Sequence, residues 1–451
     1  MLEYHVKQQV WITIRLYIGQ MLVGYGLGWT APIIPKFDDP KTSPLPNELT
    51  ETETSLIGSI LYVGTILGPY LTGYLCNAIG RKPCFILAGL ISLLSFLLLA
   101  TANNLAMIYV GRVFCGLGTG IIFIVNLVYI GEIASTNIRG ILLTSNAIFS
   151  TFGTLIVYAV GPYVSYAWVS YIAAAITAVY LLGVIFIPES PTYLILKDRK
   201  DDAGIVMEKL GRSKEYHVYR EMKIIVEKQS VLEDWKQLVT VKSNRKALFI
   251  TLTLGILQQG SGIIAVTFFA TTIFQLAGSS IEPNIATIII GVTQIFSSTL
   301  TPFFVERTGR RILLIYSTAV CTLSLATLGV YFYLDYINHP SVTKMQWLPL
   351  VTLIIFFLSY DFGFGIIPGT LIGEMFQSNV RSTGSTVSVT IAWLFGFGVA
   401  TVFGYMISDL GSHVTFWIFS SMCALACLFG IFVVPETKGK TLIEIQEMLN
   451  K

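Results

Sequence analysis

Charged residues are scarce in this chain of 451 residues. They make up 12% of it, against 54% apolar residues, and the mean hydropathy is +0.70. A soluble globular domain carries about 25% charged residues. Half of that content excludes a water-soluble protein, because much of the surface must face lipid. The net charge of +3 is also too small to favour a nucleic-acid partner.

Side chains suited to metal binding and catalysis are equally sparse. The four histidines are scattered through tails and loops, and the six cysteines fall in or beside apolar runs without the spacing of a zinc site or a disulfide framework. No nucleophile, metal cluster or acid pair stands at a spacing that suits a reaction. We therefore expect no enzyme activity, no catalytic residue, no metal site and no cofactor.

The sequence is rich in long apolar runs. Twelve windows lie between residues 10 and 434, six on each side of the charged segment 188–246. Each span needs about 20 apolar residues, so twelve spans fit this length. The sequence predicts an all-α membrane protein with twelve transmembrane helices. Its expected parts are an N-terminal six-helix half, a cytoplasmic helical linker, a C-terminal six-helix half and a cytoplasmic tail, at residues 1–187, 188–246, 247–434 and 435–451.

The basic residues indicate how the chain is oriented in the membrane. The loops on one side hold just Lys36, Lys41 and Lys344, while the segment 188–246 and the inner helix ends hold the remainder. Cytoplasmic loops are enriched in Lys and Arg, so both termini are expected in the cytoplasm. The termini carry no acidic dileucine signal, and we expect a multi-pass protein of the plasma membrane.

Three motifs occur twice in the same order, once in each half. All copies fall on the same side of the membrane, which predicts two parallel six-helix repeats, the major facilitator fold, with a substrate site near the midplane. The paired motifs are Gly80-Arg81-Lys82 with Gly309-Arg310-Arg311, Glu132 and Arg139 with Glu374 and Arg381, and Pro188-Glu189 with Pro435-Glu436.

The chain resembles the sugar porter family over nearly its whole length, from Gly24 to Glu444. The motifs that carry the resemblance are Gly111-Arg112, Glu132, Arg139-Gly140, Pro188-Glu189-Ser190-Pro191, Gln258-Gln259, Glu306-Arg307, Gly309-Arg310-Arg311 and Pro435-Glu436-Thr437-Lys438-Gly439. Within the family, Gly24-Tyr25-Gly26-Leu27-Gly28 before Pro32 is most similar to the subgroup of insect facilitated trehalose transporters and intracellular-type facilitative glucose transporters. The resemblance implies a sugar carrier that works by alternating access.

Gln258 and Gln259 are the leading substrate-binding candidates. An amide offers a donor and an acceptor, which matches the neighbouring hydroxyls of a sugar, and two amides in mid-membrane are costly without such a partner. The alternative is that they bridge helices. The resemblance points to the same pair and adds further positions. These are Gln294, Thr151, Gly365, Pro368 and, as a stacking platform, Trp393.

Asp361 is the one carboxylate that falls clearly within a span, and an intramembrane acid is a functional candidate. Proton-linked members of the family have an Asp on the first helix where this chain has Gly26, so proton symport by that route is not expected. We expect Asp361 to act in the inner cavity as a gating group, with proton coupling as the alternative. Nearby, Pro368 stands among glycines, which predicts a broken or flexible span; a static kink is the alternative.

A cluster of charges is expected to form ion pairs at the cytoplasmic ends of the spans. Charges at such positions need partners, and a cluster that closes on one side acts as a gate. Fixed topology determinants are the alternative. The residues of this expected cytoplasmic gate are Arg81, Arg112, Glu132, Arg139, Glu189, Glu306, Arg310, Arg311, Glu374, Arg381 and Glu436.

The binding surface departs from the family while the scaffold motifs are kept. Positions that usually offer polar or bulky contacts are smaller or apolar here, and Gly369 leaves room for a disaccharide. The departures are Ala147, Ile264, Phe268, Phe269, Gly369 and Ala392.

Together these features favour facilitative, uncoupled transport of a hexose or trehalose. A sugar sensor of transporter fold that does not transport, and a carrier for a polyol or another small solute, are the alternatives. The expected partners are a small sugar and the lipid bilayer, and the protein is expected to function as a monomer.

Overall fold

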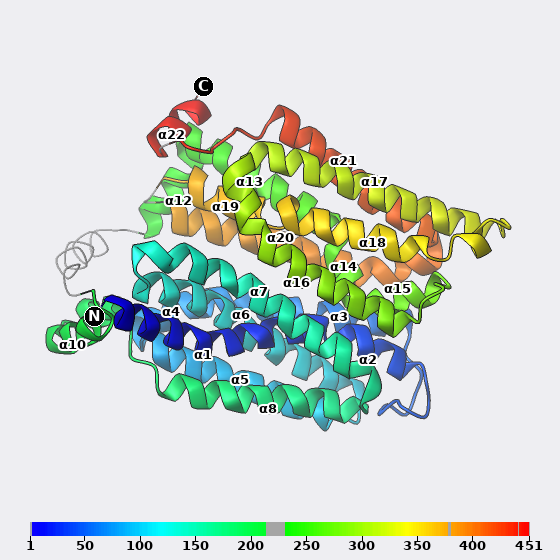
Figure 1. Ribbon diagram of the computed structural model, residues 1–451, viewed down its shortest axis with the longest axis horizontal. Helices are drawn as coiled ribbons and strands as arrows, with labels where there is room; N and C mark the ends of the chain where they lie inside the picture. Colours follow the sequence, from blue (N-terminus) through cyan, green and yellow to red (C-terminus); the bar gives the residue numbers. More distant parts are fainter. Residues whose placement is uncertain (1, 213–230, 378–379, 441, 451) are drawn as a thin grey trace. The chain divides into compact units, whose positions relative to one another are not determined.

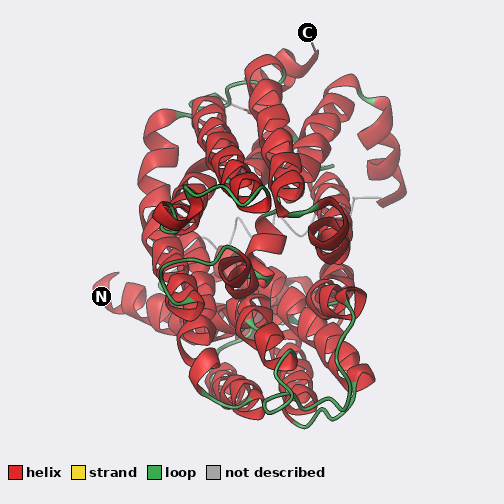
Figure 2. Ribbon diagram, turned by 90° about the vertical axis from the view of Figure 1, so that its right-hand side faces the viewer, coloured by secondary structure: helices red, strands yellow, loops and turns green. Residues whose placement is uncertain are grey.

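The computed structural model describes residues 2–212, 231–377, 380–440 and 442–450. Its regular structure over these residues is helical, without a strand (Figure 2). Twelve helical segments are long and apolar enough to cross a membrane, beginning with His5–Phe37 and ending with Ser412–Phe432. The predicted all-α architecture with twelve spans is confirmed.

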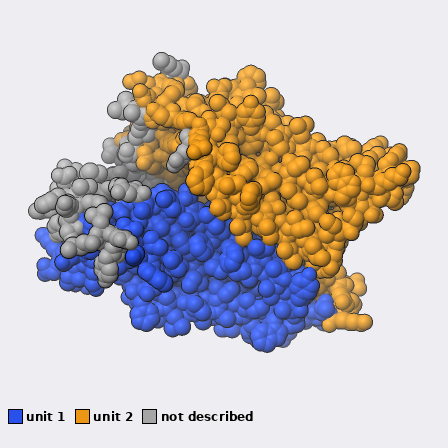
Figure 3. All heavy atoms as spheres, viewed as in Figure 1, with its two compact units in different colours: residues 1–29, 42–46, 60–229 blue, residues 30–41, 47–59, 230–451 orange. Residues whose placement is uncertain are grey.

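The chain forms two compact units (Figure 3). Unit 1 comprises residues 1–29, 42–46 and 60–229. Its helices are α1 (Leu2–Gly28), α4 (Leu61–Ala78), α5 (Arg81–Ala100), α6 (Leu105–Ile133), α7 (Thr136–Val160), the 3-10 turn η1 (Gly161–Tyr163), α8 (Tyr166–Ile185), α9 (Pro191–Leu196) and α10 (Lys200–Lys209), most of them labelled in Figure 1.

Unit 2 comprises residues 30–41, 47–59 and 230–451. Its first helices are α2 (Thr30–Phe37), α3 (Glu51–Ser59), α12 (Val231–Thr240), α13 (Lys242–Gly260), α14 (Ile263–Phe268), α15 (Ala270–Leu276) and α16 (Pro283–Thr308). They are followed by α17 (Arg310–Tyr336), η3 (Val342–Lys344), α18 (Leu348–Ser359), the π-helical turn η4 (Tyr360–Phe364), α19 (Ile367–Met375), α20 (Arg381–Tyr405), the π-helical turn η5 (Met406–Leu410), α21 (Ser412–Phe432) and α22 (Leu442–Asn450).

The two units repeat the same internal packing. In unit 1, α4 packs on α6, α5 on α6 and α8, and α1 on α7 and α8. In unit 2, α16 packs on α18, α17 on α18 and α21, and α13 on α20 and α21. Each pair in one unit has its counterpart in the other, in the same chain order. The repeat seen in the sequence motifs is therefore a repeat of helix contacts.

Glycines set how closely α4 and α6 approach. A Cβ atom added to Gly116 would stand 1.9 Å from the carbonyl oxygen of Leu61, and one added to Gly64 would stand 2.0 Å from that of Val113. No side chain fits such gaps, so the two backbones touch directly. The small residues of α4 and α6 therefore allow this close helix contact.

The first two spans are divided between the units. Their segments α2 and α3 belong to unit 2, where α3 packs on α20. Thr401 donates its hydroxyl to Ser59 Oγ at 2.8 Å, and the backbone N–H of Gly404 donates to Ser55 Oγ at 3.1 Å. The domain boundaries given above divide the chain by sequence repeat and stay a prediction. The linker contains α9, α10 and α12, while residues 213–230 lie outside the described residues.

Candidate functional site

The tenth span is interrupted in the region where Pro368 and its glycines predict a break. It runs as α18, changes to the π-helical turn η4, and resumes as α19. Gly363 lies in this turn, and a Cβ there would stand 2.3 Å from Ser317 Oγ, so the turn touches α17 directly. π-helical turns leave backbone groups without their usual helical partners and occur at functional sites.

Gln258 supplies the partner that this break needs. Its Nε2 atom donates to the carbonyl oxygens of Phe364 and Gly365, each at 2.9 Å. Non-helical backbone at membrane depth is tolerated where such side chains satisfy it. Gln258 therefore ties α13 to the break through its amide nitrogen, the bridging role that the sequence left open as an alternative.

Gln259 and Gln294 present a different arrangement. Both are buried, with 9% and 8% of their surface exposed, and the Oε1 atom of each has no hydrogen-bond partner among the described residues. A buried amide oxygen without a donor costs about 1–3 kcal/mol. The Oε1 of Gln259 faces the position of Gly396 on α20, where a Cβ would lie 3.2 Å away. These two oxygens can accept hydrogen bonds from a ligand.

Asp361 lies in η4 and accepts a hydrogen bond from the hydroxyl of Ser297 on α16. The hydroxyl of Thr301 donates to the backbone oxygen of Asp361 at 3.1 Å, and Ser297 also contacts the carbonyl of Gln294 at 3.0 Å. The acid, the helix break and Gln294 are thus connected through one face of α16.

The remaining substrate candidates lie on three helices. Thr151 belongs to α7 of unit 1, where its hydroxyl donates to the carbonyl of Ile148 at 2.9 Å. Trp393 is half-buried on α20 of unit 2. Pro368 is buried in the first turn of α19, and a Cβ on Gly369 beside it would meet no atom within 4 Å. The space at Gly369 is therefore open.

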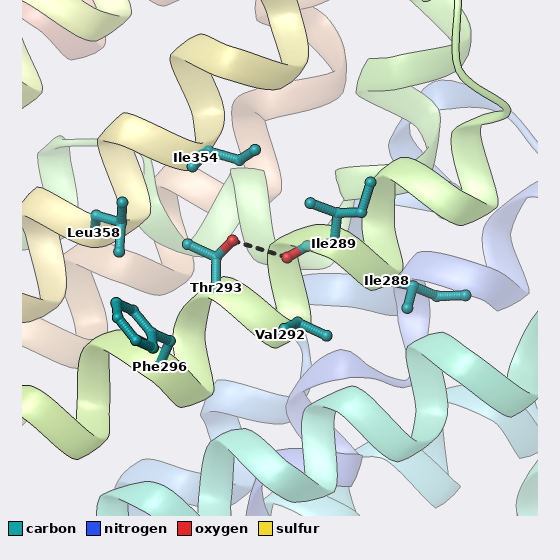
Figure 4. Close-up of a pocket in the computed structure, with 7 residues that line it drawn as sticks. All are labelled: Ile288, Ile289, Val292, Thr293, Phe296, Ile354 and Leu358. Atoms are coloured by element: carbon teal, nitrogen blue, oxygen red, sulfur yellow. Dashed lines mark hydrogen bonds between the residues drawn. The ribbon is translucent and has the colours of Figure 1, made fainter.

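An apolar pocket of about 350 Å³ lies on α16 and α18 (Figure 4). Its lining residues are Ile288, Ile289, Val292, Thr293, Phe296, Ile354 and Leu358. The hydroxyl of Thr293 donates to the carbonyl of Ile289 within its own helix at 2.8 Å. Thr293 supplies the only side-chain oxygen among the lining residues and its proton is engaged, so the pocket has little to match the several hydroxyls of a sugar.

A charge cluster braces the end of unit 1 where α5 begins. Arg81 pairs with Glu132 through two hydrogen bonds, 2.8 Å from Nη2 and 3.1 Å from Nε. Glu189 accepts the backbone N–H of Arg81 at 2.9 Å and that of Lys82 at 3.2 Å, which caps the helix start. The hydroxyl of Ser190 donates a hydrogen bond to Glu132 at 2.5 Å.

Unit 2 contains the same cluster. Arg310 pairs with Glu374 at 2.9 Å and 3.2 Å, and Glu436 accepts the backbone N–H groups of Arg310 and Arg311 at 3.0 Å and 3.1 Å. Thr437 donates its hydroxyl to Glu374 at 2.5 Å. The ion pairs described for Arg81 and Arg310 each lie inside one unit.

Partial burial and hydrogen bonding shift the pKa of Glu436 in opposite directions. Burial raises its pKa, but the backbone N–H groups of Lys438, Arg310, Arg311 and Thr437 stabilise the carboxylate and outweigh this effect. The pKa of Glu436 is therefore lower than its usual 4.5, and the cap is ionised at neutral pH.

Other gate candidates have different surroundings. Arg139 donates to the carbonyl of Ala134 at 3.1 Å and 3.3 Å, and Arg381 to that of Phe376 at 3.4 Å, so each closes the turn before its own helix. The Nε atom of Arg381 is buried without a hydrogen-bond partner among the described residues. The side chain of Glu306 lies outside the described part of the structure.

The structure does not bring Arg112 together with this cluster. Arg112 and Glu132 lie on the same helix, α6, separated by about 30 Å at 1.5 Å per residue. Arg112 is fully buried, donates to the carbonyl of Gly26 at 2.7 Å, and lies 5.3 Å from the ring centre of Trp29. It joins α6 to the end of α1 instead.

Sequence reasoning missed several residues of the site. Ser190 and Thr437 directly follow the paired Pro-Glu motifs, so the repeat itself could have found them. Ser297 carries no motif and was missed. Arg212, which donates to the backbone oxygen of Glu132 at 2.5 Å, is likewise without a sequence signal.

Two repeated six-helix bundles, matching charge clusters, and a broken tenth span near two amide oxygens that lack a partner in the described part of the chain define a membrane transporter of the major facilitator fold. The sequence matches the family described as Sugar (and other) transporter over residues 12–449. The chain belongs to this family.

Several relatives and solved structures are similar over most of the chain. Facilitated trehalose transporter Tret1 of Bombyx mori is 34% identical over 98% of this chain and 86% of its own length, and that of Culex quinquefasciatus is 32% identical over 98% and 86%. The Aedes aegypti protein of the same name is 32% identical, and the chain spans 55% of its length.

Among solved structures, the proton:xylose symporter XylE bound to 6-bromo-6-deoxy-D-glucose has a TM-score of 0.76 at 23% identity, over 99% of this chain and 100% of its own. The inward open conformation of XylE from E. coli has a TM-score of 0.80 at 22% identity, over 97% and 99%. These likenesses establish the fold.

Proposed function

We propose that the protein carries a sugar, a hexose or trehalose, across the plasma membrane by facilitative, uncoupled alternating access. The curated relatives named above are trehalose transporters by their names, which supports trehalose as the first sugar to test. The protein works as a monomer, with both termini in the cytoplasm, in line with its distribution of basic residues.

The pair of buried amide oxygens on Gln259 and Gln294 carries the proposal. Neither oxygen has a donor among the described residues, and each hydrogen bond gained from a sugar hydroxyl contributes on the order of 1 kcal/mol. A sugar that donates to these two oxygens would bind beside the broken tenth span. Its binding can therefore affect the conformation of that break. Thr151, Gly365, Pro368 and Trp393 complete the proposed contacts.

The groups around the first helix support uncoupled transport. Arg112 is bound to the backbone of Gly26, where proton-linked family members carry an acid, so a proton carrier is missing from that position. Asp361 is held by Ser297 beside the break, and we assign it to the opening of the tenth span. Asp361→Asn should slow uptake with or without a pH gradient.

Alternating access needs contacts that form and break on opposite sides. We assign the hydrogen bonds of α3 with α20, Ser55 with Gly404 and Ser59 with Thr401, to the outer closure. The inner gate is the charge cluster of Arg81, Arg139 and Arg310 with their partners. A Ser59→Cys, Thr401→Cys double variant should lose uptake on oxidation and regain it on reduction, while either single variant should not respond.

The test of the function is uptake of labelled glucose and trehalose into proteoliposomes, with and without a pH gradient, and with a protonophore. Saturable uptake that ignores the gradient is expected, together with counterflow. Uptake that collapses with the protonophore would contradict the uncoupled mode. Binding of sugar with neither uptake nor counterflow would instead identify a sensor, and transport of a polyol alone would identify the other alternative.

A further inference from the structure

A cavity of about 340 Å³ lies in unit 2 where α13 begins and α21 ends. Its walls come from three places in the sequence: Lys246 and Phe249 of α13, Phe432 and Val433 at the end of α21, and Met448 and Leu449 of α22. Helices α13 and α21 are membrane spans, whereas α22 is a short terminal helix that packs on α13 (Figure 1). The cavity therefore lies at a membrane boundary.

The side of the cavity that continues along the spans is apolar and open. Phe249, Phe432 and Val433 are 58%, 79% and 41% exposed. The ring of Phe249 is fixed edge-on against Phe429, with ring centres 6.0 Å apart. Large apolar side chains exposed on a membrane span face lipid, so an acyl chain can lie along this wall.

One lysine belongs to the lining of the cavity, and two others lie near it. Lys246 lines it directly, Lys242 lies one turn earlier and donates to the backbone oxygen of Asn450 at 2.5 Å, and Lys440 Nζ lies 2.9 Å from Met448 Sδ. The described residues that line the cavity include no carboxylate. Glu447, next to Met448, is exposed on α22.

The end of α21 is held in place for this arrangement. Arg311 donates from Nε to the carbonyl of Gly430 at 3.2 Å and from Nη2 to that of Ile431. These bonds satisfy the last carbonyls of the helix and fix Phe432 and Val433 at the rim. Lys246 and the apolar side chains of Phe249 and Phe432 thus line one cavity, and hydrogen bonds hold the end of α21 in place beside it.

We propose that this cavity binds an anionic phospholipid, with its phosphate at Lys246 and one acyl chain along Phe249 and Phe432. Basic pockets at the ends of membrane helices attract anionic head groups, with a contribution of about 1 kcal/mol from each lysine. A soluble phosphate would use the lysines but leave the apolar wall empty, so the combination selects a lipid. The proposal does not depend on which solute the protein carries.

The test is native mass spectrometry of the full chain released from nanodiscs of phosphatidylcholine with a minor share of phosphatidylglycerol. Lys246→Gln should lower the retained phosphatidylglycerol about fivefold, the effect of one lysine. Lys82→Gln is the matched control, because Lys82 is also a half-buried lysine at the start of a membrane span. Lys246→Arg should retain the lipid.

Two further arms separate the site from its alternatives. Phe432→Ala should also lower retention, whereas Phe303→Ala, at a similarly exposed phenylalanine on α16, should not. Added inorganic phosphate should leave the bound lipid in place. Equal retention by the Lys246→Gln and Lys82→Gln proteins would overturn the proposal in favour of nonspecific boundary lipid, and displacement by inorganic phosphate would reduce the site to one for small anions.

Discussion

The guanidinium of Arg81 and the carboxylate of Glu132 meet at 2.8 Å with 6% and 15% of their side chains exposed, and Arg310 and Glu374 repeat the contact at 2.9 Å with 19% and 26% exposed. The two pairs are chemically equal but differ in burial. Burial sets how much stability is lost when one residue of such a pair is replaced. The charge of the other residue then stays buried with neither a partner nor water around it.

Arg81→Ala should therefore destabilise the protein more than Arg310→Ala. We expect a loss of about 3 kcal/mol for the first and about 1–2 kcal/mol for the second. Arg199→Ala breaks an exposed pair with Asp202, 59% and 49% exposed, and should cost less than about 0.5 kcal/mol. Thermal unfolding of the three variants in one detergent checks the order, and similar losses for Arg81 and Arg199 would contradict it.

Gly116→Ala should destabilise unit 1 even though alanine is the better helix former. The added methyl group would overlap the Leu61 carbonyl, since the gap is 1.9 Å, and separating the helices should cost more than about 2 kcal/mol. Gly131 lies on the same helix with no atom within 4 Å of its Cβ position. Gly131→Ala should be neutral or stabilise by up to about 1 kcal/mol. Thermal unfolding compares the stability of the two variants. A Gly116→Ala protein as stable as the parent would contradict the close packing of α4 and α6.

Glu436 should make the stability of unit 2 depend on acid pH. Its pKa is lower when folded than its usual 4.5, so the unfolded chain takes up the proton first as pH falls. The stabilisation is complete above that usual value and is lost as pH falls through it toward the lowered folded pKa.

Glu436→Gln should be less stable than the parent at neutral pH, and the difference should shrink as the medium is acidified below about pH 5. Glu447→Gln, at an exposed acid of α22, is the control. Unfolding measured across this range decides, and a difference that stays constant with pH would show that the carboxylate charge is not what caps the helix.

The helices and the charges that need partners at their ends follow from the sequence because lipid leaves few alternatives. Apolar runs of span length must be helical, and charges at their ends need partners. The paired motifs therefore indicated that Arg81 and Glu132 share a cluster, as do Arg310 and Glu374. They could not indicate that each pair closes within its own unit, since a motif marks the end of a span and not its neighbour.

Arg112 shows where motif reasoning fails. Gly111-Arg112 resembles the other Gly-Arg motifs in composition, but it stands near the beginning of α6, whereas Glu132 stands near its end. Counting spans would have placed the two on opposite sides of the membrane. Gln258 shows a different limit, because the carbonyl groups of Phe364 and Gly365 become acceptors only once the tenth span adopts its π-helical turn, which a sequence pattern does not display.

Gly369→Trp should separate disaccharide from monosaccharide transport. The position stands beside Pro368, and a Cβ there would meet no atom within 4 Å, so a side chain can begin here without a clash and would occupy the open space. If the space serves the second ring of trehalose, the ratio of trehalose to glucose uptake should fall about tenfold or more, the usual effect of lost room in a pocket. Gly373→Trp, one turn later on α19 and also open, is the control. An equal fall for both sugars would show that Gly369 serves the moving helix and not the second ring.

Replacement by leucine should lower stability at Gln258 but lower sugar affinity at Gln259 and Gln294. In Gln258→Leu the carbonyls of Phe364 and Gly365 lose their donor, so stability should fall by about 1–3 kcal/mol. Gln259→Leu and Gln294→Leu each remove a buried oxygen that has no partner among the residues the structure describes, so stability should hold or rise while sugar affinity falls about tenfold. Thermal unfolding and sugar binding, measured on the same preparations, give the stability and the sugar affinity of each variant. A Gln259→Leu protein that loses stability and keeps its affinity would mean that this amide bridges helices, and the substrate role would pass to Gln294 alone.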